Sequence, residues 1–166
     1  MLLLMLFVLA VWVKRYAVSL ALPRMERLSD PSLSEPLSTP PLVSVLVAAR
    51  NEERTIARCL DSLLAQRYPR FEVIVADDRS EDSTPELLRT RYPSVRTVRI
   101  DSLPGGCAGK SHALSVAARE ARGDWLLFTD ADTVHSPLSI QVPLSWAVRN
   151  GVGALSLLPA PACVGF

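Results

Sequence analysis

The chain has 166 residues, of which 49% are hydrophobic and 21% charged, and its formal net charge is +1. A chain of this size can bury one core of about a domain's size, and a charge so close to neutral does not indicate a nucleic-acid partner. The three cysteines lie far apart without a CxxC pair, and the chain has two histidines. These counts indicate neither a disulfide framework nor a zinc site, and they suit a reducing compartment.

The N-terminal segment differs from the rest, because residues 1–13 form an uninterrupted apolar run that Lys14 and Arg15 follow. As a helix this run would span about 20 Å, less than a hydrocarbon core of about 30 Å. A secretory signal peptide, a core helix and a membrane anchor are all compatible with such a run. A signal peptide has its basic residues before the run and a core helix has a polar face, so we favour an anchor over residues 1–22. The basic pair would then stay inside, which predicts a cell-membrane protein with its domain on the cytoplasmic side.

Residues 23–41 are rich in Pro and Ser and show no apolar period. This composition is typical of a linker, here between membrane and domain. Residues 42–166 remain as the folded part of the chain.

Strand and helix patterns alternate after this linker. Apolar runs typical of strands occupy residues 42–49, 71–78, 124–132 and 153–159, and residues 94–100 alternate like a more exposed strand. Helical patterns occupy residues 52–66, 80–92, 109–123 and 136–150. The first helix is expected to bury one face, made of Ile56, Cys59, Leu60, Leu63 and Leu64, and the second to begin with a capping box of Ser83 and Glu86. The third has a small-residue face suited to close packing, made of Ala113, Leu114, Ala117, Ala118 and Ala121. The pattern predicts an α/β fold with an open, mostly parallel sheet and helices on both faces.

Polar residues gather where three of these strands end, and ligands of such sheets bind beyond the carboxyl ends of the strands. Each cluster also has a structural interpretation. Asn51 is a good helix N-cap, Asp77 and Asp78 suit a turn, and a histidine such as His135 often serves packing or capping. A lone DxD motif, here Asp130 with Asp132, arises often by chance. The ordered combination of the clusters is the informative signal.

That combination resembles a known family. In order along the chain, the segments VSVLVAARNEERTIARCLDSLLAQRYP, FEVIVADDRSEDST, GKSHALSVA and GDWLLFTDADTVHSP resemble the nucleotide-sugar-binding half of inverting family 2 glycosyltransferases, which have the GT-A fold. The form TDADTVHSP is most similar to membrane-associated enzymes such as hopanoid-associated or carotenoid glycosyltransferases. The resemblance covers residues 43 to about 158. It implies transfer of a sugar from a nucleotide-sugar donor, expected to be a UDP-sugar, to a hydroxyl of a lipid or isoprenoid acceptor.

The resemblance also implies roles for individual residues of the donor site. The end of the first strand, from Ala49 through Asn51 to Glu52, matches the segment that lies against the nucleotide. Asp78 matches the residue that hydrogen-bonds the base edge, with Asp77 beside it. Lys110 matches a lysine near the diphosphate, where its point charge would offset phosphate charge.

Asp130 and Asp132 match the DxD pair of the family. The resemblance makes Asp132 the more direct metal ligand, with Asp130 nearer the ribose or the metal. Apart from the resemblance, His135 is a further candidate for a metal or phosphate contact. Mg²⁺ or Mn²⁺ prefers oxygen ligands and keeps some from water and phosphate, so one or two carboxylates suffice. Such a cation would stabilise the diphosphate leaving group.

The family places its catalytic base and acceptor site well beyond the DxD motif, and 34 residues follow Asp132 here. We therefore assign no residue as the base and expect residues 42–166 to be the donor-binding half of an enzyme, with an apolar face of the sheet left uncovered. A non-catalytic, membrane-tethered nucleotide-sugar binder is an alternative. A nucleotidyltransferase is a third interpretation, although VAARNEERT lacks the glycine-rich loop that wraps a triphosphate.

Overall fold

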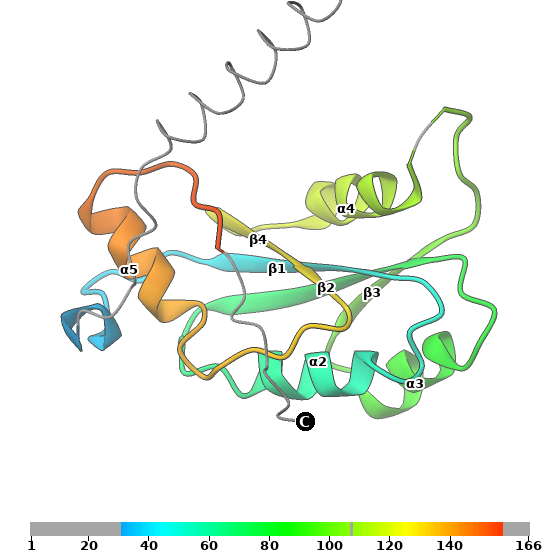
Figure 1. Ribbon diagram of the computed structural model, residues 1–166, viewed down its shortest axis with the longest axis horizontal. Coiled ribbons are helices and arrows are strands. Elements are labelled where there is room, and N and C mark those ends of the chain that lie inside the picture. Colours follow the sequence, from blue (N-terminus) through cyan, green and yellow to red (C-terminus); the bar gives the residue numbers. More distant parts are fainter. Residues whose placement is uncertain (1–30, 107, 158–166) are drawn as a thin grey trace, which may run out of the picture.

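A single parallel sheet with helices on both faces forms the centre of the protein (Figure 1). The computed structural model describes residues 31–106 and 108–157. The strands are β1 (Val43–Ala49), β2 (Phe71–Asp78), β3 (Arg96–Ile100) and β4 (Trp125–Asp130), in the spatial order β3-β2-β1-β4. The helices are a short 3-10 turn η1 (Pro31–Ser34), then α2 (Ile56–Leu64), α3 (Thr84–Arg91), α4 (Gly109–Glu120) and α5 (Gln141–Arg149). Every strand pair is parallel, which confirms the predicted α/β sheet.

Two hydrophobic layers hold the helices on the sheet, because successive side chains of a strand point to opposite faces. Val45 and Val47 of β1 belong to the cluster that contains α2, whereas Leu46 between them belongs to the cluster that contains α4. Ala113 and Ala117 are fully buried in the second cluster. The predicted small-residue face of α4 is confirmed, since these alanines let the helix pack closely on β1 and β2.

Three local predictions were wrong. Leu64 ends α2 and is 46% exposed, because the other four residues of its predicted face already fill the contact with the sheet. Ser83 makes no side-chain capping bond; instead the backbone N–H of Thr84 donates to Asp82 Oδ1 at 2.9 Å. Residues 153–157 form no strand, and the exposed side chains of Leu155 and Leu157 have no packed layer beneath them that would favour one.

The described part of the expected linker packs on α5. Leu33 of η1 is buried, Gln141 donates to the carbonyl of Glu35 at 2.9 Å, and Arg149 donates to Ser32 Oγ at 2.8 Å. Residues 1–22, where we expect the membrane anchor, lie outside the described residues. None of the helices within the described ranges is long and apolar enough to cross a bilayer.

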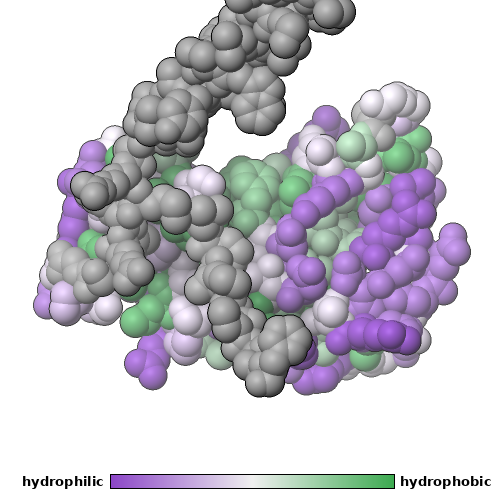
Figure 2. All heavy atoms as spheres, viewed as in Figure 1, coloured by the Kyte–Doolittle hydropathy of each residue, from purple (hydrophilic) through white to green (hydrophobic). Residues whose placement is uncertain are grey.

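Strand β4 carries an uncovered apolar face. Leu126 is 41% exposed and Phe128 is 53% exposed, because α4 lies over β1 and β2 and leaves this part of β4 open. Figure 2 shows a hydrophobic patch near the upper middle of the view and mostly hydrophilic residues toward the right, where the loops after β1 and β2 lie. For the part of the chain that the structure describes, the expected exposed apolar face of the sheet is therefore confirmed on β4.

Candidate functional site

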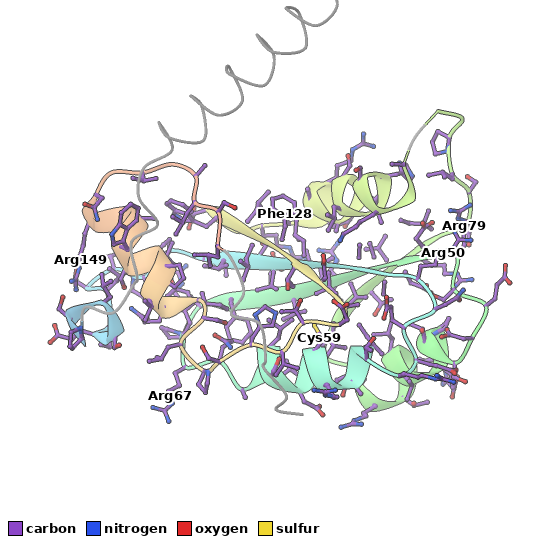
Figure 3. The ribbon with its side chains drawn as sticks, viewed as in Figure 1. Arg50, Cys59, Arg67, Arg79, Phe128 and Arg149 are labelled. Carbon is purple, nitrogen blue, oxygen red and sulfur yellow. The ribbon has the colours of Figure 1, made fainter. Side chains whose placement is uncertain are left out.

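The carboxyl ends of β1, β2 and β4 meet at one edge of the sheet, as parallel strands require. The pairing register places Ala49 of β1 beside Asp77 of β2, and Ala48 beside Asp130 of β4. Figure 3 shows Arg50 and Arg79 at the same end of the molecule, on the loops that follow β1 and β2. The sheet thus brings the predicted acidic clusters together at the expected edge.

The two aspartates that end β2 lie on opposite faces of the sheet. Asp77 is 1% exposed, forms an ion pair with Arg99 of β3, and accepts a hydrogen bond from the Ser80 backbone N–H at 3.1 Å. Its carboxylate is enclosed by protein partners. Asp77 therefore lies beside the site, as predicted, but in this structure it holds the loop after β2.

Asp78 points to the face that α4 covers. It is 4% exposed, and Arg79 donates to its two oxygens at 2.8 and 3.3 Å. The hydrogen bond from Arg79 lowers the pKa of this carboxyl, and the charges of Arg50 and His112 lower it further. Asp78 is therefore ionised at neutral pH and acts as a hydrogen-bond acceptor.

Gly109, the first residue of α4, lies directly against this carboxylate. A Cβ atom built on Gly109 would be 2.7 Å from Asp78 Oδ2, a distance that real Cβ contacts do not reach. Any larger residue at this position would force the start of α4 or the Asp78 side chain to shift. The start of α4 is thereby fixed next to Asp78.

Asn51 links the loops after β1 and β2. Its backbone N–H donates to Ser80 Oγ at 3.0 Å, and its side-chain Oδ1 accepts from the Glu81 backbone N–H at 2.8 Å. Asn51 has a φ of 56°, a left-handed conformation that asparagine tolerates better than most residues. The alternative that Asn51 caps a helix is wrong, because the N-cap of α2 is Thr55.

Glu52 and Ala49 are both held by the protein itself. The backbone N–H of Glu52 donates to Thr84 Oγ1 at 2.9 Å, and its carboxylate accepts a short hydrogen bond from the Thr55 hydroxyl. Ala49 is 2% exposed with its side chain in the α2-side core, so only its backbone can face a ligand. The joined loops surround an open depression lined by Asn51, Glu52, Glu53, Arg54, Thr55, Glu81 and Asp82.

Asp130 ends β4 on the same face as Asp78 and is paired with α4. Lys110 Nζ lies 2.6 Å from Asp130 Oδ1, and the two side chains are 59% and 55% exposed. Asp132, two residues later, is exposed on the turn that follows the strand. Two accessible carboxylates with hard oxygen atoms suit Mg²⁺ or Mn²⁺ when water and phosphate supply the other ligands. Within residues 31–106 and 108–157, no three His, Cys, Asp or Glu side chains are grouped to hold a metal ion by themselves.

His135 lies among hydroxyl groups in this structure. Its Nε2 is 3.0 Å from Thr129 Oγ1, its Nδ1 is 3.5 Å from Ser139 Oγ, and burial lowers its pKa. The structure thus shows a packing role for the ring, and its contact with metal or phosphate stays a prediction. The Cys59 thiol lies close to the same motif. Burial raises the pKa of Cys59 to about 12, and the negative charges of Asp132 and Asp130 raise it further.

Three residues of the site were not identified from the sequence: Arg79, Arg99 and Gly109. An arginine directly after two aspartates is a usable signal for an ion pair, so Arg79 could have been found. The Arg99 contact depends on the register of β2 and β3, in which Asp77 and Arg99 are partners. The role of Gly109 depends on where α4 meets β2, which no local pattern reveals.

Comparisons with known proteins agree with this geometry. Residues 44–157 match the family described as Glycosyl transferase family 2. The beta-monoglucosyldiacylglycerol synthase of Synechocystis sp. is 36% identical over 134 residues, which cover 74% of this chain and 27% of the synthase. The 4,4'-diaponeurosporenoate glycosyltransferase of Staphylococcus haemolyticus is 39% identical over 119 residues, which cover 70% of this chain and 32% of that enzyme.

Among solved structures, the mannosyltransferase PcManGT from Pyrobaculum calidifontis, in complex with GDP-Man and Mn²⁺, superposes with a TM-score of 0.64 at 32% identity. The match covers 76% of this chain and 38% of the mannosyltransferase. The chain therefore spans only about a third of the length of these relatives. On the family match and on the order of its strands and acidic motifs, this chain belongs to glycosyl transferase family 2.

Proposed function

We propose that this chain binds the nucleotide-sugar donor of a glycosyltransferase that moves a sugar to an acceptor hydroxyl. One observation carries the proposal: the first turn of α4 connects two acidic strand ends on one face of the sheet. Gly109 lies against Asp78 and Lys110 pairs with Asp130. A nucleotide sugar needs a hydrogen-bond acceptor for its base, a positive charge near its diphosphate and oxygen ligands for a metal ion. Asp78, Lys110 and Asp130 provide these three.

The donor contacts follow from this arrangement. Asp78, ionised and fixed by its neighbours, accepts a hydrogen bond from the base edge, and Asp77 supports it by holding the loop after β2. The backbone of Ala49 and the loop at Asn51 and Glu52 lie along the nucleotide. Lys110 faces the diphosphate, where its charge is favourable.

Asp130 and Asp132 are the proposed ligands of a divalent cation, Mg²⁺ or Mn²⁺. Their carboxylates are accessible at the end of β4 and its turn, and the related mannosyltransferase structure contains Mn²⁺ with its nucleotide sugar. A bound cation supplies positive charge that offsets the charge on a departing diphosphate. His135 is retained as a further candidate contact to this region.

The proposed reaction is a single inverting displacement, in which the acceptor hydroxyl attacks the anomeric carbon, a carboxylate takes its proton, and the bond from that carbon to the diphosphate breaks so that the nucleoside diphosphate leaves. We assign no such base among residues 31–106 and 108–157. A lipid or isoprenoid acceptor is supported by the names of two relatives, the beta-monoglucosyldiacylglycerol synthase and the 4,4'-diaponeurosporenoate glycosyltransferase. Such acceptors fit a protein at the cell membrane, with residues 1–22 as anchor and the domain on the cytoplasmic side.

The test is calorimetric titration of the full 166-residue chain in detergent with UDP, with and without Mn²⁺, and with GDP for comparison. We expect metal-dependent UDP binding that weakens at least about tenfold in Asp132→Ala, because a lost charged ligand removes a strong contact. Glu86→Ala is the matched control, since it removes an exposed carboxylate from α3, away from the site.

The competing interpretations have separate outcomes in this experiment. Absence of nucleotide binding by a chain that unfolds cooperatively would contradict the proposed donor site. Robust sugar transfer by the 166-residue chain alone would show that the base lies within it, against our expectation. Release of pyrophosphate from a nucleoside triphosphate would favour a nucleotidyltransferase instead.

A further inference from the structure

Lys110 differs in kind from the other cations around the site. The chain contains two lysines, Lys14 and Lys110, and its other basic residues apart from histidine are arginines. At the end of β2, arginines hold Asp77 and Asp78, both of which are buried. An arginine forms a rigid planar fork, whereas a lysine is a compact point charge on a flexible stem. Lys110 is therefore the cation of the site best suited to changing partners.

The present partner of Lys110 is an oxygen that a metal ion would need. Nζ lies 2.6 Å from Oδ1 of Asp130, so the ammonium donates to one of the two oxygens that this carboxylate offers. A divalent cation binds carboxylate oxygen at about 2.1 Å and repels a positive charge a few ångströms away. Lys110 and a metal ion consequently compete for Asp130.

The ion pair is also easily exchanged. Both side chains are more than half exposed, and ion pairs in such positions stabilise a protein little. Lys110 is the second residue of α4, a helix of 12 residues whose N-terminal N–H groups favour an anion. A diphosphate carries more charge than one carboxylate and would be a stronger partner for the ammonium at this point.

We propose that Lys110 is the resident counter-ion of Asp130 in the donor-free protein and moves its contact to the donor diphosphate as the donor binds. Metal binding at Asp130 and Asp132 then depends on the nucleotide, because only the donor removes the competing charge. This inference rests on the proposed function and gives Lys110 two effects of opposite sign. Lys110 weakens metal binding by the free protein and strengthens nucleotide binding.

The experiment measures two ligands separately on the full chain in detergent. Free Mn²⁺ is followed by electron paramagnetic resonance without nucleotide, and UDP is titrated by calorimetry in the presence of EDTA. In Lys110→Met we expect Mn²⁺ alone to bind about threefold tighter and UDP alone about tenfold weaker. Lys110→Arg keeps the charge and is expected to bind UDP within about threefold of the native chain.

Arg89→Met is the control for the loss of one positive charge, because Arg89 pairs with Glu86 on exposed α3 and should change neither constant. Unchanged Mn²⁺ affinity in Lys110→Met, or a loss of affinity for both Mn²⁺ and UDP, would overturn the proposed exchange. UDP binding by the native chain would still support the proposed donor site in that case. If a cooperatively folded native chain binds neither probe, the proposed function and the exchange both fail.

Discussion

The carboxylates at the ends of β2 and β4 show how one sheet edge can combine fixed and adjustable charges. β2 lies between β1 and β3, so Asp77 is enclosed and its partner Arg99 comes from the neighbouring strand. Among the described strands β4 is at the edge, and Asp130 is 55% exposed and pairs with Lys110 across the surface. Burial makes the first charge costly to leave unpaired, whereas solvent makes the second pair exchangeable. We infer that Asp77 fixes the loop after β2, whereas Asp130 is left available for ligands.

The largest expected effect is a difference in stability between variants of Asp77 at the end of β2 and of Asp130 at the end of β4. Asp77→Ala should lower the free energy of unfolding by about 2–3 kcal/mol, because it removes the acceptor of the Ser80 N–H and breaks a pair with one fully buried partner. Asp130→Ala should lower it by no more than about 0.5 kcal/mol, as expected of an exposed pair. Urea unfolding followed by circular dichroism measures both. Equal losses in the two variants would contradict the comparison.

The second effect tests the close contact between α4 and the β2 end. Gly109→Ala places a methyl group where the nearest carboxylate oxygen is 2.7 Å away, so either α4 or Asp78 must shift. We expect a loss of about 1–2 kcal/mol in stability, typical of overpacking, together with weaker UDP binding. Gly105→Ala is the matched control, because a Cβ there meets nothing within 4 Å. Similar behaviour of the two variants would show that α4 does not press on Asp78.

The third effect is a pH dependence at the β2 end. The hydrogen bond from Arg79 lowers the pKa of Asp78 in the folded chain, so its contribution to stability is present above the unfolded pKa of about 3.9. This contribution is lost as the pH falls through the lower folded value. We expect Arg79→Met to lower the melting temperature at pH 7, and the difference from the native chain to shrink below about pH 4. A difference that stays constant from pH 7 to pH 3 would contradict this linkage.

The sequence predicted the features that repeat along an element. Apolar runs identified β1, β2 and β4, and an alternating pattern identified β3. The spacing of Ile56, Cys59, Leu60 and Leu63 identified the buried face of α2. Parallel topology then placed Asp78 and Asp130 at one edge without any knowledge of their contacts. These predictions succeeded because strand and helix periodicity are local properties of the chain.

The features that sequence reasoning missed depend on contacts between distant residues. Ser83 does not cap α3 through its side chain, because the Asp82 carboxylate accepts the hydrogen bond from the Thr84 backbone N–H instead. Short-range sequence patterns do not show which of two neighbouring polar side chains makes such a bond. Asn51 forms hydrogen bonds with the loop after β2 and does not cap α2. Its partners Ser80 and Glu81 are 29 and 30 residues away in the sequence, so a local pattern could not reveal these bonds. Which of two good polar groups wins is decided by tertiary packing.

The smallest effect concerns the open face of β4 itself. Phe128 is 53% exposed, so replacing it with serine should change the free energy of unfolding by less than about 0.5 kcal/mol. The same change removes apolar surface from β4, an outer strand of the sheet within residues 31–106 and 108–157, and strand edges favour association between chains. We therefore expect Phe128→Ser to reduce aggregation in light scattering at unchanged stability. Val134→Ser, which removes an exposed apolar side chain from a loop, should help less, because the loop at Val134 offers no strand edge for a second chain to pair with.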